Sequence, residues 1–245
     1  MLPGNHGEAF PETSLTLVNH LRSADASLRW EAIRLVAARY WLPLYDYARR
    51  LPLTSHEAAD AVQDFFYHVI THQESFAAFD AHQGKLRTWI VTIFRHRLTN
   101  MRVKQQALRR GGGAEHLPLD FDYAEMSYLQ HAAEDALDPE RAFDRAFARQ
   151  LWQQVLESLR HSYALRHRTR HFAILSPLIL TDFKDQPLTS RELAERAGLE
   201  DESQVKAVLH RLRKEAAYEF QRLVRLTVEG DDWKQEVRYL LDLVS

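Results

Sequence analysis

Apolar residues recur at intervals of three and four along most of the chain, which is the spacing of one face of an α-helix. The first such pattern covers residues 28–48, LRWEAIRLVAARYWLPLYDYA. Pro43 interrupts it, and we expect the helix to kink or restart there because proline has no backbone N–H. No convincing run shows the alternating pattern of a strand. The chain is therefore predicted to be all-α.

A second helical pattern covers residues 54–73, TSHEAADAVQDFFYHVITHQ. Thr54 or Ser55 can cap this helix, and Thr54 with Glu57 has the spacing of a capping box, in which each side chain bonds the other residue's backbone N–H. The apolar positions predict one inner face, made of Ala58, Val62, Phe65, Phe66 and Val69.

The third pattern, residues 85–113, is KLRTWIVTIFRHRLTNMRVKQQALRRGGG, and three glycines end it. Its apolar stripe consists of Leu86, Trp89, Ile90, Ile93, Phe94, Leu98 and Met101. We expect Phe94 to belong to the core, and the cations Arg87, Arg95, Arg102 and Lys104 to form a surface patch. No Asp or Glu stands between Ala81 and Ala114, although the whole chain has a net charge of −2. Such a local patch favours binding of a polyanion.

The charge then reverses, because residues 111–137 contain several acids and neither Lys nor Arg. This segment is interpreted as a flexible linker. Asp138 and Pro139 are typical of a helix start, and apolar residues follow every four positions, at Phe143, Phe147, Leu151, Val155, Leu159 and Tyr163. The predicted organisation is an N-terminal tail (1–26), a first helical domain (27–110), the acidic linker (111–137), a second helical domain (138–230) and a C-terminal helix (231–245).

The stretch LTSRELAERAGLEDESQVKAVLHRLRKE, residues 188–215, has the pattern of a helix-turn-helix. Thr189 and Glu192 form a second capping box, Gly198 ends the first helix, and Asp201 with Gln204 caps the next. The outer face of the second helix includes Ser203, Lys206, His210, Arg211, Arg213 and Lys214. A helix of this kind can lie in the major groove of DNA, although many helix pairs joined at a glycine only pack together.

Composition excludes several classes of protein. The chain has no cysteine, which rules out disulfides and thiolate metal sites, and no apolar run reaches the roughly 20 residues of a membrane span. Its N-terminus lacks the pattern of a secretory signal, so the cytoplasm is the expected compartment and no membrane partner is expected.

Chemistry of the kind that enzymes use is also missing. The histidine pairs His68/His72 and His167/His171 have ligand spacing but lack the intervening glutamate of a zinc motif, and three arginines crowd the second pair. No phosphate-cradling loop and no activated nucleophile are recognisable. We therefore expect no metal, no cofactor and no enzymatic activity.

Five stretches of the chain resemble, in order and spacing, the extracytoplasmic-function (ECF) group of the sigma-70 family. They are ARYWLPLYDYARR, HEAADAVQDFFYHVI, residues 85–113, LDPERAFDRAFARQLWQQVLESLR and residues 190–215. The resemblance runs from about Leu28 to Arg225. It implies a region 2 helical bundle and a region 4 helix-turn-helix domain joined by a flexible linker. The implied partners are the core of bacterial RNA polymerase and promoter DNA, with an anti-sigma factor as a further candidate.

Carried over by position, the resemblance implies three sets of contact residues. The polymerase-binding set is Asp60, Gln63, Asp64 and Phe65. The set facing the −10 element, which includes the loop 79–85 that captures a flipped base, is Phe79, Asp80, His82, Lys85, Arg87, Trp89, Arg95, His96, Asn100, Arg102 and Lys104. The set facing the −35 element is Ser203, Gln204, Lys206, His210, Arg211, Arg213 and Lys214.

Two features leave this assignment open in part. Val208 stands where the family often has a polar residue, and the turn LEDESQVK is one residue longer than the usual pattern. The alternative interpretation is a stand-alone helix-turn-helix regulator, which would leave the first domain without a role.

Overall fold

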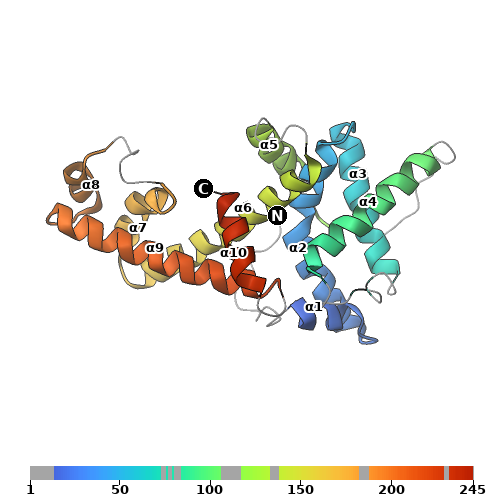
Figure 1. Cartoon of the computed structure of the whole chain (residues 1–245), viewed down its shortest axis with the longest axis horizontal. Coiled ribbons are helices and arrows are strands. Elements are labelled where there is room, and N and C mark those ends of the chain that lie inside the picture. The colour runs from blue at the N-terminus through green and yellow to red at the C-terminus, as the bar shows by residue number, and fades with distance from the viewer. Residues whose placement is uncertain are drawn as a thin grey trace. The chain divides into compact units, whose positions relative to one another are not determined.

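The computed structural model describes residues 14–72, 76, 79, 84–105, 117–132, 138–181, 188–228 and 232–244, with the backbone alone for residues 14, 15 and 101–105. Within these ranges the chain forms ten α-helices and no strand, which confirms the all-α prediction (Figure 1). Among the described helices, none combines the length and the apolar character that crossing a membrane requires.

The chain divides into two compact units. Unit 1 comprises residues 1–147 and 225–233, and unit 2 comprises residues 148–224 and 234–245. Helix α6 (Pro139–Leu165) has residues in both units and begins where the sequence predicts. Asp138 Oδ1 accepts hydrogen bonds from the backbone N–H groups of Glu140 (3.0 Å) and Arg141 (3.1 Å). The domain limits derived from the sequence stay a prediction.

Helix α2 (Ala26–Arg49) is the centre of unit 1. It packs against α1 (Ser14–Leu21), α3 (Ser55–Thr71), α4 (Leu86–Gln105) and α5 (Phe121–His131) (Figure 1). The helix continues through Pro43, so the predicted restart is wrong. Pro43 is itself buried, and so are aromatic residues close to it in the sequence, such as Tyr40 and Tyr45. Burial of several large side chains, at about 1.5–3 kcal/mol each, outweighs the roughly 3 kcal/mol that an internal proline costs.

Helices α3 and α4 confirm most of the local predictions. Thr54 and Glu57 form the capping box, with Thr54 N–H donating to Glu57 Oε2 at 2.8 Å and Glu57 N–H donating to Thr54 Oγ1 at 3.3 Å. The five residues of the predicted inner face of α3 are all buried. Phe94 of α4 is buried too, and its ring meets those of Tyr47 and Phe65 edge-on.

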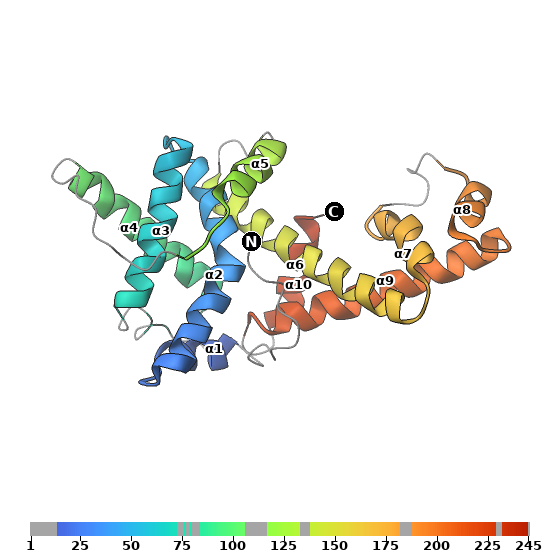
Figure 2. The same cartoon turned by 180° about the vertical axis from the view of Figure 1, so that it is seen from behind.

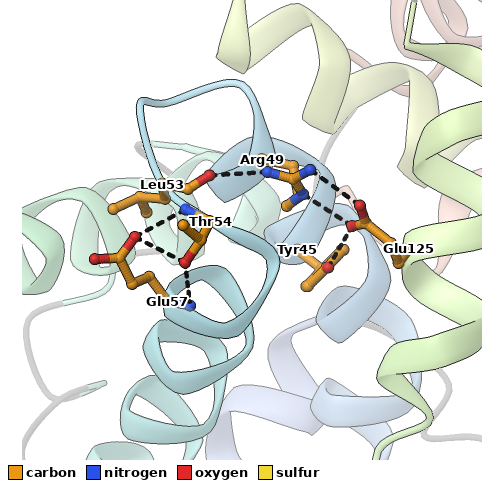
Figure 3. Close-up of polar contacts among 6 residues, drawn as sticks. All are labelled: Tyr45, Arg49, Leu53, Thr54, Glu57 and Glu125. Atoms are coloured by element: carbon orange, nitrogen blue, oxygen red, sulfur yellow. Dashed lines mark hydrogen bonds and ion pairs between the residues drawn. The ribbon is translucent and has the colours of Figure 1, made fainter.

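Helix α5 lies inside the segment interpreted as a linker. Asp120 caps it by accepting from Tyr123 N–H at 2.9 Å, and Phe121 packs against Trp41 and Tyr45 of α2. Glu125 anchors the helix, as Figure 3 shows. Its carboxylate accepts from Tyr45 Oη (2.6 Å) and from Arg49 Nε and Nη2 (2.8 and 3.0 Å). The hydrogen bonds from Arg49 lower the pKa of Glu125.

The anchor predicts a pH-dependent loss of stability on removal of Glu125. We expect Glu125→Ala to lower the free energy of unfolding by about 1–3 kcal/mol at neutral pH, because Arg49 and Tyr45 lose a charged acceptor. A carboxylate with a depressed pKa stabilises the fold above its unfolded-state pKa and loses this effect as the pH falls through the folded-state pKa. The variant and the wild type should therefore converge in acid, below the usual titration range of glutamate.

Urea unfolding at neutral and acidic pH measures this difference. Asp122→Ala is the matched control, because Asp122 is an exposed acid on the same helix. Equal stabilities of the Glu125 variant and the wild type at neutral pH would contradict the anchoring role.

Unit 2 is built around α6 and α9 (Glu202–Arg225), which run beside each other in both views (Figures 1 and 2). The predicted inner residues Leu151, Val155, Leu159 and Tyr163 are all buried. Helix α7 (Thr169–Leu175), the 3-10 turn η2 (Ser176–Leu178), α8 (Ser190–Ala197) and α10 (Trp233–Asp242) complete the unit.

The predicted helix ends around α8 are confirmed. Thr189 and Glu192 form a capping box, and Gly198 ends the helix with φ at 73°, in the left-handed region that favours glycine. A short turn leads into α9, where Asp201 Oδ1 accepts from Gln204 N–H at 2.9 Å. That bond and the hydroxyl of Ser203 lower the pKa of Asp201.

Candidate nucleic-acid and polymerase interface

The outer face of α3 presents only part of the predicted polymerase-binding set. Asp60 is exposed and Gln63 is half-buried. Asp64 is half-buried and accepts from Arg97 of α4, whose Nη2 and Nε lie 2.6 and 3.0 Å from Asp64 Oδ2. Phe65 is 0% exposed, which places its side chain in the core instead of on a surface. Asp60 and Gln63 are therefore the members best placed to meet a partner.

The outer face of α4 carries the exposed residues Arg95, His96 and Asn100. The prediction that Arg87 belongs to a surface patch is wrong. Its side chain is only 5% exposed and forms an ion pair with Asp144 of α6. Arg95 reaches Glu140 of the same helix at 3.0 Å in a largely exposed pair. The first turns of α6, which belong to unit 1, thus supply acids to two of the predicted DNA-binding cations.

The aromatic members of the −10 set lie together. Phe79 is 5% exposed, and its ring centroid lies 5.9 Å from that of Trp89, which is half-buried on α4. Lys85, just before α4, is half-buried. Asp80 and His82 lie outside the described residues, and so do the side chains of Arg102 and Lys104.

The −35 set separates into residues with and without a structural contact. Ser203, Lys206, His210, Arg211 and Lys214 are exposed. Gln204 is half-buried, and its amide donates to Glu200 at 2.9 Å. Arg213 donates to the carbonyl oxygens of Leu178 (3.0 Å), Ile179 (3.2 Å) and Thr181 (2.6 Å). Arg213 thereby ties α9 to the end of η2.

The exposed cations of α9 lie in two different environments. Arg211 and Lys214 line a surface pocket together with Ser158 and Ser162 of α6. Lys206 is not part of that lining and lies one turn inside the start of α9.

Neither histidine pair belongs to a larger ligand cluster. The rings of His68 and His72 lie 4.2 Å apart, and His72 Nδ1 pairs with Thr71 Oγ1 at 2.8 Å. Burial lowers the pKa of His171, and the positive charges of the nearby Arg168 and Arg170 lower it further. Across the described ranges, no three His, Asp or Glu side chains are grouped so that they could hold a metal ion.

One known family matches the stretch that contains α3, α4 and the second half of α2. Residues 37–108 match Sigma-70 region 2. The match supports a sigma factor of the sigma-70 family, and such factors act in promoter recognition by RNA polymerase. No curated protein and no solved structure matches the chain. The region 2 match includes the α3 surface, the Phe79–Trp89 pair and the exposed face of α4.

Proposed function

We propose that this protein is an ECF-group sigma factor that binds core RNA polymerase and directs initiation at specific promoters, with no enzymatic activity of its own. The observation that carries the proposal is the region 2 match, because it covers α3 and α4, the helices that hold the predicted polymerase-binding and −10 residues. The paired helices α8 and α9, with an exposed basic face, suit recognition of a second promoter element.

In this proposal, Asp60 and Gln63 meet the polymerase, and the α4 face with Arg95, His96 and Asn100 meets the −10 DNA. An acid-free helix that carries Trp89 suits single-stranded DNA, which is bound by cations along its backbone and by aromatic rings beside its bases. Ser203, Lys206 and His210 face the −35 DNA.

The decisive experiment adds the purified full-length chain to core polymerase on fragmented bacterial DNA and maps the transcription starts. A sigma factor gives discrete starts with a shared upstream pattern, whereas core polymerase alone gives none. The stand-alone regulator, the alternative favoured by α8 and α9 alone, binds DNA without polymerase and produces no new start. The latter result would overturn the proposal.

Lys206→Ala distinguishes two ways of contacting the −35 element. If Lys206 contacts a guanine edge, we expect a cost of about 1–3 kcal/mol on the preferred promoter and a relaxed preference at one position. If it holds a phosphate, affinity falls evenly for all sequences. Binding titrations against a set of −35 variants measure the difference.

Ser203→Ala and Gln204→Ala test whether the long turn shifts the base contact by a fraction of a helical turn. Arg160→Ala is the control, because Arg160 is an exposed arginine of α6 whose partner is Glu157. Wild-type behaviour of all three α9 variants would exclude this helix from the groove.

A further inference from the structure

Helix α1 precedes the region 2 match and packs on α2. Among its described side chains, Leu17, Val18 and Leu21 are buried. Arg22 follows the last residue of α1, and its backbone N–H donates to Val18 O at 3.1 Å. The start of the Arg22 side chain is therefore fixed by a packed helix end.

The guanidinium of Arg22 contacts the backbone of Phe76 and Phe79, two residues that precede α4 in the chain. Its Nε and Nη2 donate to the carbonyl oxygen of Phe76 at 3.0 and 2.8 Å, and Nη2 also donates to the carbonyl oxygen of Phe79. The two phenylalanine side chains are buried. The planar donors of arginine suit this task, because one side chain can hold two neighbouring carbonyl groups at once.

Phe79 also contacts the helix that carries the predicted −10 residues. Phe79 packs its ring against Trp89 of α4, so Arg22, Phe79 and Trp89 form one connected set of contacts. Residue 79 is also where the predicted base-capturing loop begins. A shift of the Phe79 carbonyl group would therefore move both the start of that loop and the ring that supports Trp89.

We propose that Arg22 is a positioning residue for promoter opening, which fixes Phe79 and Trp89 for capture of the unpaired −10 strand. The role rests on the proposed function. It predicts a defect in the step from closed to open complex. In the proposed function, polymerase binding uses the α3 surface and binding of the −35 duplex uses the α9 surface, and neither includes Arg22. A residue that only stabilised the fold would lower all three steps together.

Arg22→Ala removes the donors, and Arg22→Lys keeps the charge but not the planar fork. Arg29→Ala is the matched control, because Arg29 in the first turns of α2 donates from Nη1 at 3.0 Å to the carbonyl oxygen of Ser23, in the α1–α2 connection. Each full-length variant is assembled with core polymerase on a promoter obtained from the start mapping. Polymerase affinity, duplex binding at low temperature, the permanganate reactivity of −10 thymines and the thermal unfolding midpoint are measured.

We expect Arg22→Ala to open the promoter about tenfold more slowly, with polymerase affinity and closed-complex binding within about twofold of wild type. Arg22→Lys should be intermediate and Arg29→Ala should match wild type. Wild-type opening by Arg22→Ala, or an equal loss in all steps, overturns the positioning role. If Arg22→Ala does not fold, Arg22→Lys is judged by the same ratio of opening to closed binding. Wild-type chain that opens no promoter overturns the proposed function, and this role with it.

Discussion

Replacing Arg95, Arg102 and Lys104 together with alanine should lower the salt dependence of promoter binding by roughly two to three units of log–log slope. Each phosphate contact contributes about 0.7 units on single-stranded DNA and about 0.9 on duplex. Counterion release of that size corresponds to roughly 100- to 1,000-fold in affinity at 0.1 M salt. Arg95 must exchange Glu140 for a phosphate, but their ion pair is largely exposed and therefore weak.

Titrations of holoenzyme with promoter DNA at several salt concentrations measure this slope. Arg34→Ala is the control, because Arg34 is an exposed arginine of α2 outside the predicted surface. A triple variant with the wild-type slope would mean that these three cations face solvent in the complex.

Asp64→Arg should destabilise unit 1, whereas Asp60→Arg should weaken polymerase binding with the stability unchanged. The first substitution places a positive charge against Arg97, and we expect it to lower the free energy of unfolding by about 1–2 kcal/mol, since the pair is partly exposed. The second changes an exposed residue on the predicted contact face. A loss of polymerase binding in Asp64→Arg alone would therefore not identify a contact.

The charge-swapped double variant, Asp64→Arg with Arg97→Asp, separates the two effects. It should recover much of the stability in urea unfolding, because the ion pair between α3 and α4 forms again in the opposite sense. Unchanged stability in the single variant Asp64→Arg would contradict the structural role of this pair. Unchanged polymerase affinity in Asp60→Arg would exclude the predicted contact face of α3.

The features predicted correctly from the sequence are governed by local geometry. Capping boxes such as Thr54 with Glu57 depend on residues three positions apart, and the inner faces of α3 and α6 follow from the helical period. Gly198 was predictable for the same reason, because a left-handed helix end has a residue preference of its own.

The features that the sequence did not predict depend on partners distant along the chain. The buried position of Arg87 depends on Asp144, and the anchoring contacts of Glu125 depend on Arg49 and Tyr45, all more than fifty residues away along the chain. A basic residue on a helix has the same sequence pattern whether it faces solvent, an acid or a carbonyl group. The cap at Asp120 was a local signal for α5, although the acidity of the segment favoured a linker.

The start of α6 also determines where the protein can be divided for experiments. A fragment that ends at residue 110 would lack Phe143 and Phe147, whose rings stack on Tyr40 at centroid distances of 6.4 and 5.4 Å. It would also lack Asp144 and Glu125, so Arg87 and Arg49 would lose their acidic partners. Because α6 runs on to Leu165, a cut after Phe147 would sever a continuous helix. A cut after Leu165 would instead remove Leu151, Val155 and Leu159 from the core of unit 2. Experiments should therefore use the full-length chain, because neither unit can be separated without dividing or losing α6.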